Sequence, residues 1–353
     1  LKIKKMTSML FHRGPDKSRV VKSKDSLLAF SRLKIIDFSD AAMQPMVSVD
    51  KKHVLVFNGE IYNYKELKEK IGNKYNFQTK SDTEVLLAML KLYGHSCLND
   101  INGMFAFCLY DLENNNYMLA RDRFGQKPLY FSKKNGSIYF SSEIKALLVA
   151  GIISEPNLES ISEYLNYGIL DSKETTWFKN ITQVKAGEIL FIDRFNKIKK
   201  QKWYDLEKKD FSKATENISD KKKFIGETFM KVCEEHLNSD TKIGIKLSGG
   251  LDSSTMLASM EKNKKYLSNQ CFSVDFGSRF SEKEWIMDTA KYFNKKINII
   301  SYRENDFLKD FEKLIYTHEG PLGGLMNCAF EKVYQSAREK GIRVLLDGTG
   351  LDE

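Results

Sequence analysis

Short apolar runs separated by turn residues dominate the first two hundred residues of the chain. The runs are rich in β-branched and aromatic residues, which is typical of β-strands. They cover residues 53–57, 103–111, 117–120, 138–140 and 188–192. Residues 83–93 (TEVLLAMLKLY) differ, because their length and the following Gly94 indicate a helix. The pattern predicts a first region of β-sheet with one prominent helix.

The pattern changes after a polar, lysine-rich stretch at residues 196–223, which we interpret as a linker. Strand-like and helix-like segments then alternate to the end of the chain. Strands are expected at residues 242–247, 270–276, 296–300 and 343–346, and helices at 225–237, 252–262, 285–293 and 331–340. This alternation predicts a parallel sheet covered by helices.

The composition narrows the class of protein. With 353 residues, of which 42% are hydrophobic, the chain is long enough for two domains. Its net charge of +9 comes from dispersed lysines and arginines, without the basic stripe and interleaved aromatic residues that are typical of nucleic-acid binding. Its five cysteines are irregularly spaced, and no apolar run in the sequence reaches the length of a membrane span. We expect a cytoplasmic protein with no nucleic-acid or membrane partner.

Both ends of the sequence are unusual. It begins with Leu1 and a helix-like stretch, and it ends at Glu353 soon after a strand and a glycine-rich turn. We expect the sequence to be a fragment, truncated at both ends.

The segment KLSGGLDSS (residues 246–254) follows the first expected strand of the second region and precedes a helix. Its glycines let backbone N–H groups approach an anion, and the helix N-terminus adds further donors. Ser248, Ser253 and Ser254 add hydroxyl groups. Asp252 would repel a phosphate unless a cation lay between them, which indicates Mg²⁺ and a pyrophosphate group. The alternative is an ordinary turn in which a polar side chain caps a helix.

A second acidic loop, DGTGLDE (residues 347–353), follows the strand at residues 343–346. Ligands of open parallel sheets bind at the carboxyl ends of the strands. If the strands before the two loops are neighbours, Asp352 and Asp252 can share one metal ion. The sequence therefore predicts Mg²⁺ between the two loops.

KLSGGLDSS resembles the pyrophosphate loop of the ATP pyrophosphatases, which split ATP between its α- and β-phosphates. The first region adds an ordered series of motifs: HRGPD, SRLKIID, FNGEIYNY, SDTEVLL, GMFAF, ARDRFGQKPLY and SSEIKAL. In that order, and followed by SGGLDSS, they resemble the glutamine-hydrolysing asparagine synthetases over nearly the whole chain. The resemblance implies an αββα sandwich of the Ntn-hydrolase type at residues 1–204, which is a class II glutamine amidotransferase domain. It also implies an α/β parallel-sheet ATP-pyrophosphatase domain at residues 205–353.

The resemblance implies a binding site for free glutamine in the first domain. Arg32 matches the arginine that grips the α-carboxylate with two parallel hydrogen bonds, and Glu60 and Asp82 match the acids that hold the α-ammonium group. Asn58 and Gly59 match the oxyanion hole, whose donors point at the charge that develops on the glutamine carbonyl. The substrate-binding segment after Arg32 comprises Leu33, Lys34, Ile35 and Ile36.

Each of these residues also has a simpler interpretation. Asn58-Gly59 is a common hairpin turn, although the segment that follows it has a helical rather than a strand pattern. Asp82 could only cap the helix at residues 83–93, and Arg32 and Glu60 could be surface charges. The intact set favours a working glutaminase.

The nucleophile of the family that the chain resembles is the thiol of a cysteine at the mature N-terminus, with its own α-amine nearby as a base. The present sequence begins downstream of that position. Its five cysteines are Cys97, Cys108, Cys233, Cys271 and Cys328, and we expect all five to be packing residues.

In the second domain, the resemblance implies that ATP transfers AMP to a carboxylate and that ammonia, arriving through an internal channel, displaces the AMP. The residues that match the ATP site are Leu247, Ser248, Gly249, Gly250, Asp252, Ser253, Ser254, Val274, Asp347 and Gly348, with Asp252 and Asp352 as ligands of Mg²⁺. Asparagine synthetases usually have Ser-Gly-Glu-Gly-x-Asp-Glu where this chain has Asp-Gly-Thr-Gly-Leu-Asp-Glu. Thr349 thus replaces a glutamate linked to formation of the aspartyl adenylate. His318 and Glu319 fall either near the acceptor carboxylate or at a helix end before a Pro-Gly loop.

These expectations combine into a glutamine-dependent, ATP-dependent amidotransferase, most simply one that converts aspartate to asparagine with release of AMP and pyrophosphate. Glutamine, ATP and aspartate are its expected substrates, and a homodimer is compatible with the resemblance. Two alternatives stay open. One is a related enzyme that amidates another acceptor, such as a sugar of a surface polysaccharide or a peptide carboxylate, which Thr349 and Asp347 favour. The other is a non-catalytic relative that binds nucleotide or glutamine.

Overall fold

The computed structural model describes residues 2–24, 26–170, 173–208, 217–261, 267–277 and 281–351, apart from the side chains of residues 304 and 325. The chain divides into two compact units, residues 1–210 and residues 211–353. Each unit has its own sheets and its own hydrophobic core. The expected domain boundary between residues 204 and 205 stays a prediction.

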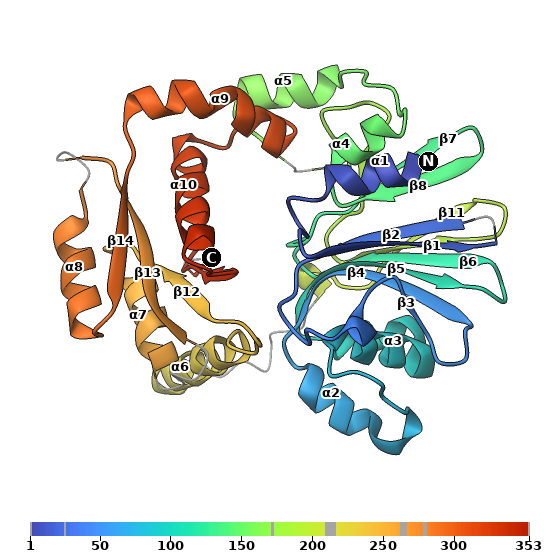
Figure 1. Ribbon diagram of the computed structural model, residues 1–353, viewed down its shortest axis with the longest axis horizontal. Coiled ribbons are helices and arrows are strands. Elements are labelled where there is room, and N and C mark those ends of the chain that lie inside the picture. Colours follow the sequence, from blue (N-terminus) through green and yellow to red (C-terminus); the bar gives the residue numbers. More distant parts are fainter. Residues whose placement is uncertain are drawn as a thin grey trace. The chain divides into compact units, whose positions relative to one another are not determined.

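A six-stranded antiparallel sheet lies at the centre of the first unit (Figure 1). In spatial order its strands are β11 (Ile198–Lys202), β10 (Glu188–Ile192), β6 (Asn116–Arg121), β5 (Gly103–Asp111), β4 (His53–Ile61) and β3 (Met46–Val47). Successive side chains of a strand point to opposite faces of the sheet. Phe105 and Phe107 of β5 therefore enter one core cluster, while Ala106 and Cys108 enter another on the opposite face.

Two helices cover the first of these faces, namely α2 (Tyr64–Ile71) and α3 (Asp82–Tyr93). The other face packs against a second β layer. That layer contains the hairpin β1 (Lys17–Ser23) and β2 (Ser26–Arg32), and the sheet β8 (Ser137–Ser141), β7 (Tyr130–Lys134) and β9 (Thr182–Gln183). Helices α1 (Lys2–Met9) and α4 (Ile144–Val149) cover its outer side, where Met6 and Leu147 pack near Tyr130 and Tyr139. The layers follow the order α, β, β, α, which confirms the predicted sandwich.

The first unit has further helices among its described residues. They are α5 (Leu158–Tyr167) and the short 3-10 helices at Asp40–Ala42, Gly72–Lys74, Gly94–Asn99 and Leu206–Lys208.

The interpretation of residues 196–223 as a linker was wrong in part. Residues Ile198–Lys202 form β11, which pairs with β10 at one side of the six-stranded sheet. Its sequence, IKKQK, is polar because the strand pairs on one side only and its side chains are half-buried or exposed. Helix α6 (Ile218–Glu235) also begins inside the predicted linker, with Asn217 as its N-cap, and has only one buried residue, Cys233.

A four-stranded parallel sheet forms the second unit and confirms the predicted α/β architecture. Its strands, in spatial order, are β14 (Lys296–Ser301), β13 (Leu267–Asp275), β12 (Ile243–Lys246) and β15 (Val344–Leu346). Helices α6, α7 (Leu251–Met260) and α8 (Lys283–Tyr292) share a core cluster with Ile243 and Ile245 on one face of the sheet. Helix α10 (Leu325–Glu339) packs on the opposite face through Val333, and α9 (Glu304–His318) packs on α10.

Helix α9 had no counterpart among the expected elements. Its last residue is His318, and Glu319 adopts the left-handed conformation that follows many helix ends, with φ 61°. The segment THEGPLGG thus begins with a helix end, as one of its two interpretations required.

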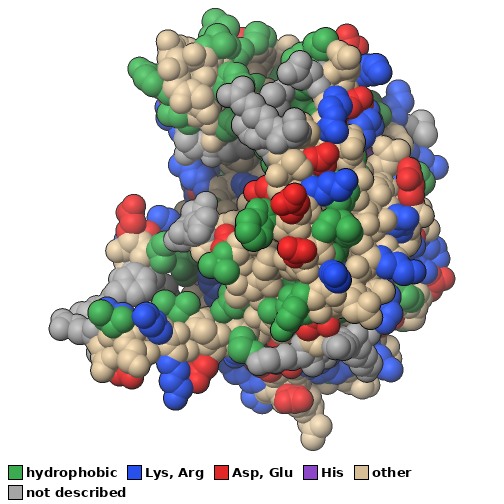
Figure 2. Space-filling view, turned by 90° about the vertical axis from the view of Figure 1, so that its left-hand side faces the viewer, with side chains coloured by type: hydrophobic (Ala, Val, Ile, Leu, Met, Phe, Trp, Pro, Cys, Tyr) green, Lys and Arg blue, Asp and Glu red, His purple; other side chains and the backbone are tan. Residues whose placement is uncertain are grey.

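Charged side chains of both signs are interspersed on the face of the molecule shown in Figure 2. Among the described residues, no helix combines the length and the apolar character that crossing a bilayer requires.

Candidate functional site

A cavity of about 760 Å³ in the first unit brings the candidate glutamine residues together. Every residue of β2 and of β8 lines the cavity, so the cavity lies beside these two strands of the second β layer. The predicted residues that line the cavity are Arg32, Leu33, Ile35, Ile36, Asn58, Gly59, Glu60 and Asp82. Lys34 is not among the lining residues, and its backbone N–H donates to the Asp16 carboxylate at 2.7 Å.

Arg32 is the last residue of β2 and is only 4% exposed. Its Nη1 donates to the carbonyl oxygen of Ser39 at 2.7 Å, and its Nη2 donates to the carbonyl oxygen of Asp37. Burial lowers the pKa of Arg32, although the charges of Asp37, Asp40 and Asp16 oppose that shift. A guanidinium group has five N–H donors, so these two contacts leave it capacity to bind a carboxylate in the cavity.

Asn58 and Gly59 lie inside strand β4, so the hairpin-turn interpretation does not apply. Gly59 faces Phe105 across the β4–β5 pair. A Cβ atom at position 59 would lie 2.1 Å from the carbonyl oxygen of Met104, which leaves room only for glycine. The side-chain amide of Asn58 is 3.5 Å from the hydroxyl oxygen of Ser142, at the rim of β8. The pair therefore sits at a fixed position in the cavity wall.

Asp82 and Glu60 place two carboxylates that interact electrostatically in the lining of the cavity. Ser81, and not Asp82, is the N-cap of α3, because its side chain accepts from the Glu84 N–H at 3.3 Å. The Asp82 carboxylate instead accepts from the N–H groups of Ile61 at 3.1 Å and Thr83 at 2.8 Å. Burial raises the pKa of Asp82 to about 6, despite these hydrogen bonds. Burial and the charge of Asp82 raise the pKa of Glu60 to about 7, so a cationic ligand would favour the ionised forms of both groups.

Lys127 is a lining residue that the sequence did not single out. Burial lowers its pKa, and the charge of Glu60 opposes that shift. In turn, the charge of Lys127 lowers the pKa of Glu60. Lys127 belongs to the motif ARDRFGQKPLY, which contributed to the resemblance but gave no indication that this lysine faces Glu60.

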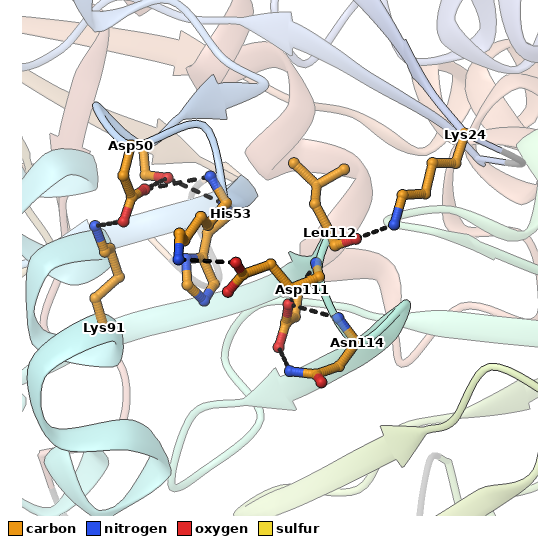
Figure 3. A network of polar contacts seen from close by, with 10 residues as sticks. Lys24, Asp50, His53, Lys91, Asp111, Leu112 and Asn114 are labelled. Atoms are coloured by element: carbon orange, nitrogen blue, oxygen red, sulfur yellow. Dashed lines mark hydrogen bonds and ion pairs between the residues drawn. The ribbon is translucent and has the colours of Figure 1, made fainter.

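A polar network at the other end of α3 fixes the helix that begins at Asp82 (Figure 3). Asp50, in the turn between β3 and β4, accepts from Lys91 of α3 at 2.7 Å and from the Ser48 hydroxyl at 2.6 Å. These hydrogen bonds hold the pKa of Asp50 well below its ordinary value. The network lies outside the cavity lining, so its effect on the site is through the position of α3.

The five cysteines are free thiols, and all are buried. Burial raises the pKa of each: that of Cys97 to about 12, those of Cys233 and Cys271 to about 11, and those of Cys108 and Cys328 above their ordinary values. The reactive form of cysteine is the thiolate, which these environments disfavour. The result agrees with the expectation that they are packing residues.

In the second unit, the loop after β12 satisfies many of its own hydrogen-bonding groups. The Ser253 hydroxyl accepts from the Ser248 N–H at 3.1 Å, and the two hydroxyl oxygens are 2.9 Å apart. The Gly250 N–H donates to the Ser248 hydroxyl at 3.2 Å, and the Ser254 hydroxyl donates to the Gly250 carbonyl at 3.0 Å. Leu247 is buried in the core beneath the loop. The loop is therefore closed on itself at the carboxyl end of its strand.

Glu282 is a second residue that the sequence did not single out. Its Oε2 accepts from the backbone N–H of Gly249 at 3.1 Å. A Cβ atom at position 249 would lie 2.9 Å from the Cβ of Glu282, so glycine is needed for this approach. The Glu282 carboxylate thus already accepts a hydrogen bond from a backbone N–H that the sequence predicts to bind phosphate.

The two acidic loops lie on neighbouring strands, because β12 pairs in parallel with β15. A Cβ atom at Gly348 would lie 3.2 Å from the Cβ of Asp252 and from the Ser253 nitrogen, which shows how closely the loops approach. Val274 lies in neither loop. It belongs to β13, the strand on the other side of β12. Asp352 lies outside the described residues.

The donor set fits Mg²⁺ only in part. Asp252 lies in the first turn of α7, at the edge where the loops meet. Among the described residues, no cluster of three or more His, Cys, Asp or Glu side chains could hold a metal ion. Mg²⁺ usually binds to one or two carboxylates together with phosphate oxygens and water, and Asp252 suits that arrangement.

Comparisons with known proteins agree with this division of the chain into two sites. A family profile described as a glutamine amidotransferase domain matches residues 1–204, and one described as asparagine synthase matches residues 225–353. A putative glutamine-hydrolysing asparagine synthetase of Methanocaldococcus jannaschii is 32% identical over 99% of this chain and 71% of its own length. The chain belongs to the glutamine-hydrolysing asparagine synthetase family.

Other members of the family are longer. A glutamine-hydrolysing asparagine synthetase of Bacillus subtilis is 31% identical over 99% of this chain, and the chain spans 55% of that relative. A protein of Gibberella zeae that is 28% identical over 98% of the chain, and of which the chain spans 53%, is named an amidase. The relatives thus carry different names, asparagine synthetase and amidase.

Proposed function

We propose that the complete protein is a glutamine-dependent, ATP-dependent amidotransferase that acts in the cytoplasm and converts aspartate to asparagine. Residues 1–204 form the glutaminase domain, and residues 205–353 belong to the synthetase domain. The observation that carries the proposal is one cavity whose lining includes Arg32, Asn58, Gly59, Glu60 and Asp82. Its opposite charges match the two charged groups of a free amino acid.

In the first domain, Arg32 binds the α-carboxylate of glutamine with the donors that its two backbone contacts leave over. Glu60 and Asp82 bind the α-ammonium group, whose charge favours their ionised forms. The Asn58 amide and the Gly59 N–H stabilise the oxyanion that forms when a thiol attacks the side-chain carbonyl. The high pKa values of the five cysteines support a nucleophile other than these residues.

In the second domain, the loop at residues 247–254 binds the phosphates of ATP. Its hydroxyl groups exchange contacts within the loop for contacts with phosphate oxygens, and Gly249 releases Glu282. Mg²⁺, when bound, neutralises the charge of the pyrophosphate that leaves, with Asp252 and Asp352 as its protein ligands. Leu247, Val274, Asp347 and Gly348 surround the adenosine.

A second acceptor is favoured by one specific observation. Thr349 stands where the family motif has a glutamate, and a hydroxyl cannot carry a glutamate's charge. The Gibberella zeae relative is likewise named an amidase rather than an asparagine synthetase. In this alternative, the ATP and glutamine sites keep their roles and a carboxylate other than aspartate is amidated.

The purified full-length protein tests the proposal. With ATP, Mg²⁺, glutamine and aspartate, we expect equal amounts of pyrophosphate and asparagine, which coupled enzymes and amino-acid chromatography measure. If pyrophosphate is released only with a different carboxylic acid, that acid replaces aspartate as the proposed acceptor. Absence of pyrophosphate with every carboxylic acid tried, in a protein that still binds ATP, would overturn the proposal in favour of a non-catalytic relative.

A further inference from the structure

Lys246 is the last residue of β12, one position before the predicted nucleotide loop. In the register of the β12–β15 pair, Ile245 faces Leu346, so Lys246 faces Asp347. Ile245 and Leu247 enter the core on the α7 side of the sheet. Lys246, between them, therefore points to the opposite face, which α10 covers.

The Lys246 ammonium group is held there by two contacts. Its Nζ is 2.7 Å from the Asp347 Oδ2, and both side chains are mostly buried, with 14% and 27% of their surfaces exposed. The same Nζ lies 3.6 Å from the centre of the Phe330 ring of α10. An ion pair in such a partly dry position is stronger than one in water, and the aromatic ring adds a cation–π contact.

The Asp347 carboxylate connects Lys246 to the loop that Asp347 begins. Burial alone would raise the pKa of Asp347, but the hydrogen bond and charge of Lys246 and the Thr349 N–H lower it, so the carboxylate is ionised. Its Oδ1 accepts from that N–H at 3.1 Å. Asp347 and Thr349, the two departures from the family motif, are thus joined to each other and to Lys246.

The loop between these two residues touches the first turn of α7. Gly348 lies so close to Asp252 and Ser253 that a Cβ atom there would be 3.2 Å from both. The ion pair of Asp347 thus lies one residue from the point where the two loops approach each other.

We propose that Lys246 is a positioning residue of the nucleotide site. Through Asp347 it fixes Gly348 and Thr349 against the first turn of α7, and so sets the opening between the two loops for MgATP. This inference rests on the proposed function of the second domain. It concerns the first residue of the segment KLSGGLDSS, which the sequence did not single out as a site residue and which belongs to strand β12 rather than to the loop.

The test is a double-mutant cycle read by calorimetric titration of the purified full-length protein with MgATP. Lys246→Met and Asp347→Asn should each weaken binding by about tenfold, and the double variant should be no weaker than either single variant, because all three lose one shared contact. Lys242→Met, an exposed lysine before the same strand, is the matched control and should bind as the unaltered protein does.

Two further measurements distinguish a positioning role of Lys246 from a purely structural one. The KM for ATP in pyrophosphate exchange should rise in both single variants more than kcat falls, while thermal unfolding shows that both variants are still fully folded at the assay temperature. Additive losses in the cycle, or a Lys246→Met variant with unaltered affinity for MgATP, would overturn the inference while leaving the proposed function intact. Failure of the unaltered protein to bind MgATP would overturn the proposed function and this inference together.

Discussion

In the first unit, the predicted charged groups of the candidate glutamine site come from two strands and the start of a helix, and they line a preformed cavity. In the second unit, the polar groups of the candidate ATP site lie in loops at strand ends and bind one another. In the first site, burial raises the pKa values of Asp82 and Glu60. In the second site, Ser248, Ser253 and Gly249 already make hydrogen bonds that a ligand must replace. The comparison indicates that protons compete with ligand in the first unit and that internal hydrogen bonds compete in the second.

The largest expected effect comes from the cavity wall. Gly59→Ala places a methyl group where the Met104 carbonyl oxygen lies, and should lower the glutamine-dependent rate by at least about a hundredfold through displacement of the oxyanion hole. Synthesis with ammonium chloride in place of glutamine should persist. Gly226→Ala is the control, because position 226 is open helix surface where alanine is favoured. Equal loss of the two activities would show that Gly59 supports the whole fold rather than the glutamine site.

Proton competition predicts a pH dependence for glutamine binding. The ionised forms of Glu60 and Asp82 bind the ammonium group, and their pKa values of about 7 and about 6 belong to a coupled pair that also faces Lys127. Affinity should therefore be highest well above pH 7, fall by up to about tenfold per unit between pH 7 and pH 6, and fall by up to about a hundredfold per unit below both values. Titration calorimetry between pH 5 and pH 8 measures this, and Glu60→Gln should flatten the upper part of the curve. A flat profile in the unaltered protein would contradict the assignment of the two acids.

Internal competition predicts a gain of function in the second unit. Glu282→Gln removes the negative charge beside the Gly249 N–H, so MgATP should bind several-fold more tightly, which corresponds to about 1 kcal/mol, the net worth of one ordinary hydrogen bond. Glu284→Gln, two residues further on α8 and exposed, is the matched control. Weaker binding in Glu282→Gln than in the control would mean that Glu282 helps to hold the nucleotide.

The smallest effect belongs to the network around Asp50. Its pKa is depressed in the folded state, so its contribution to stability is present above the ordinary aspartate pKa and is lost as the pH falls through the lower, folded value. Because Asp50 is 39% exposed, Lys91→Met should lower the free energy of unfolding at pH 7 by only about 0.5–1 kcal/mol. Urea unfolding at pH 7 and pH 3 measures this, and the difference between the proteins should shrink at pH 3. A difference that grows toward pH 3 would assign the stabilisation to another group.

Much of the fold follows from local pattern. Strands β5 and β10 have the predicted bounds because their side chains are almost all buried, and α3 begins one residue before its predicted start. The hairpin β1–β2 was missed because its first strand, KSRVVKS, is mostly exposed and carries little apolar signal. Strand β11 was missed for a similar reason.

The prediction of site residues has the same limit, because local motifs identify only some of them. Motifs indicated Arg32, Asn58 and Asp82 because each belongs to a recognisable run of residues. Lys246 and Glu282 were missed because what distinguishes them is a contact with a residue far away in the sequence. Such contacts depend on strand order and register, which no local pattern specifies.

The central claim is that the cavity beside Arg32 binds free glutamine. Calorimetric titration of L-glutamine into the purified full-length protein tests it most directly, with Arg32→Met compared with Arg19→Met, an exposed arginine on the adjacent strand β1. The account predicts that Arg19→Met binds glutamine as the unaltered protein does and that Arg32→Met shows no measurable heat of binding. Equal affinity in the two variants would contradict it.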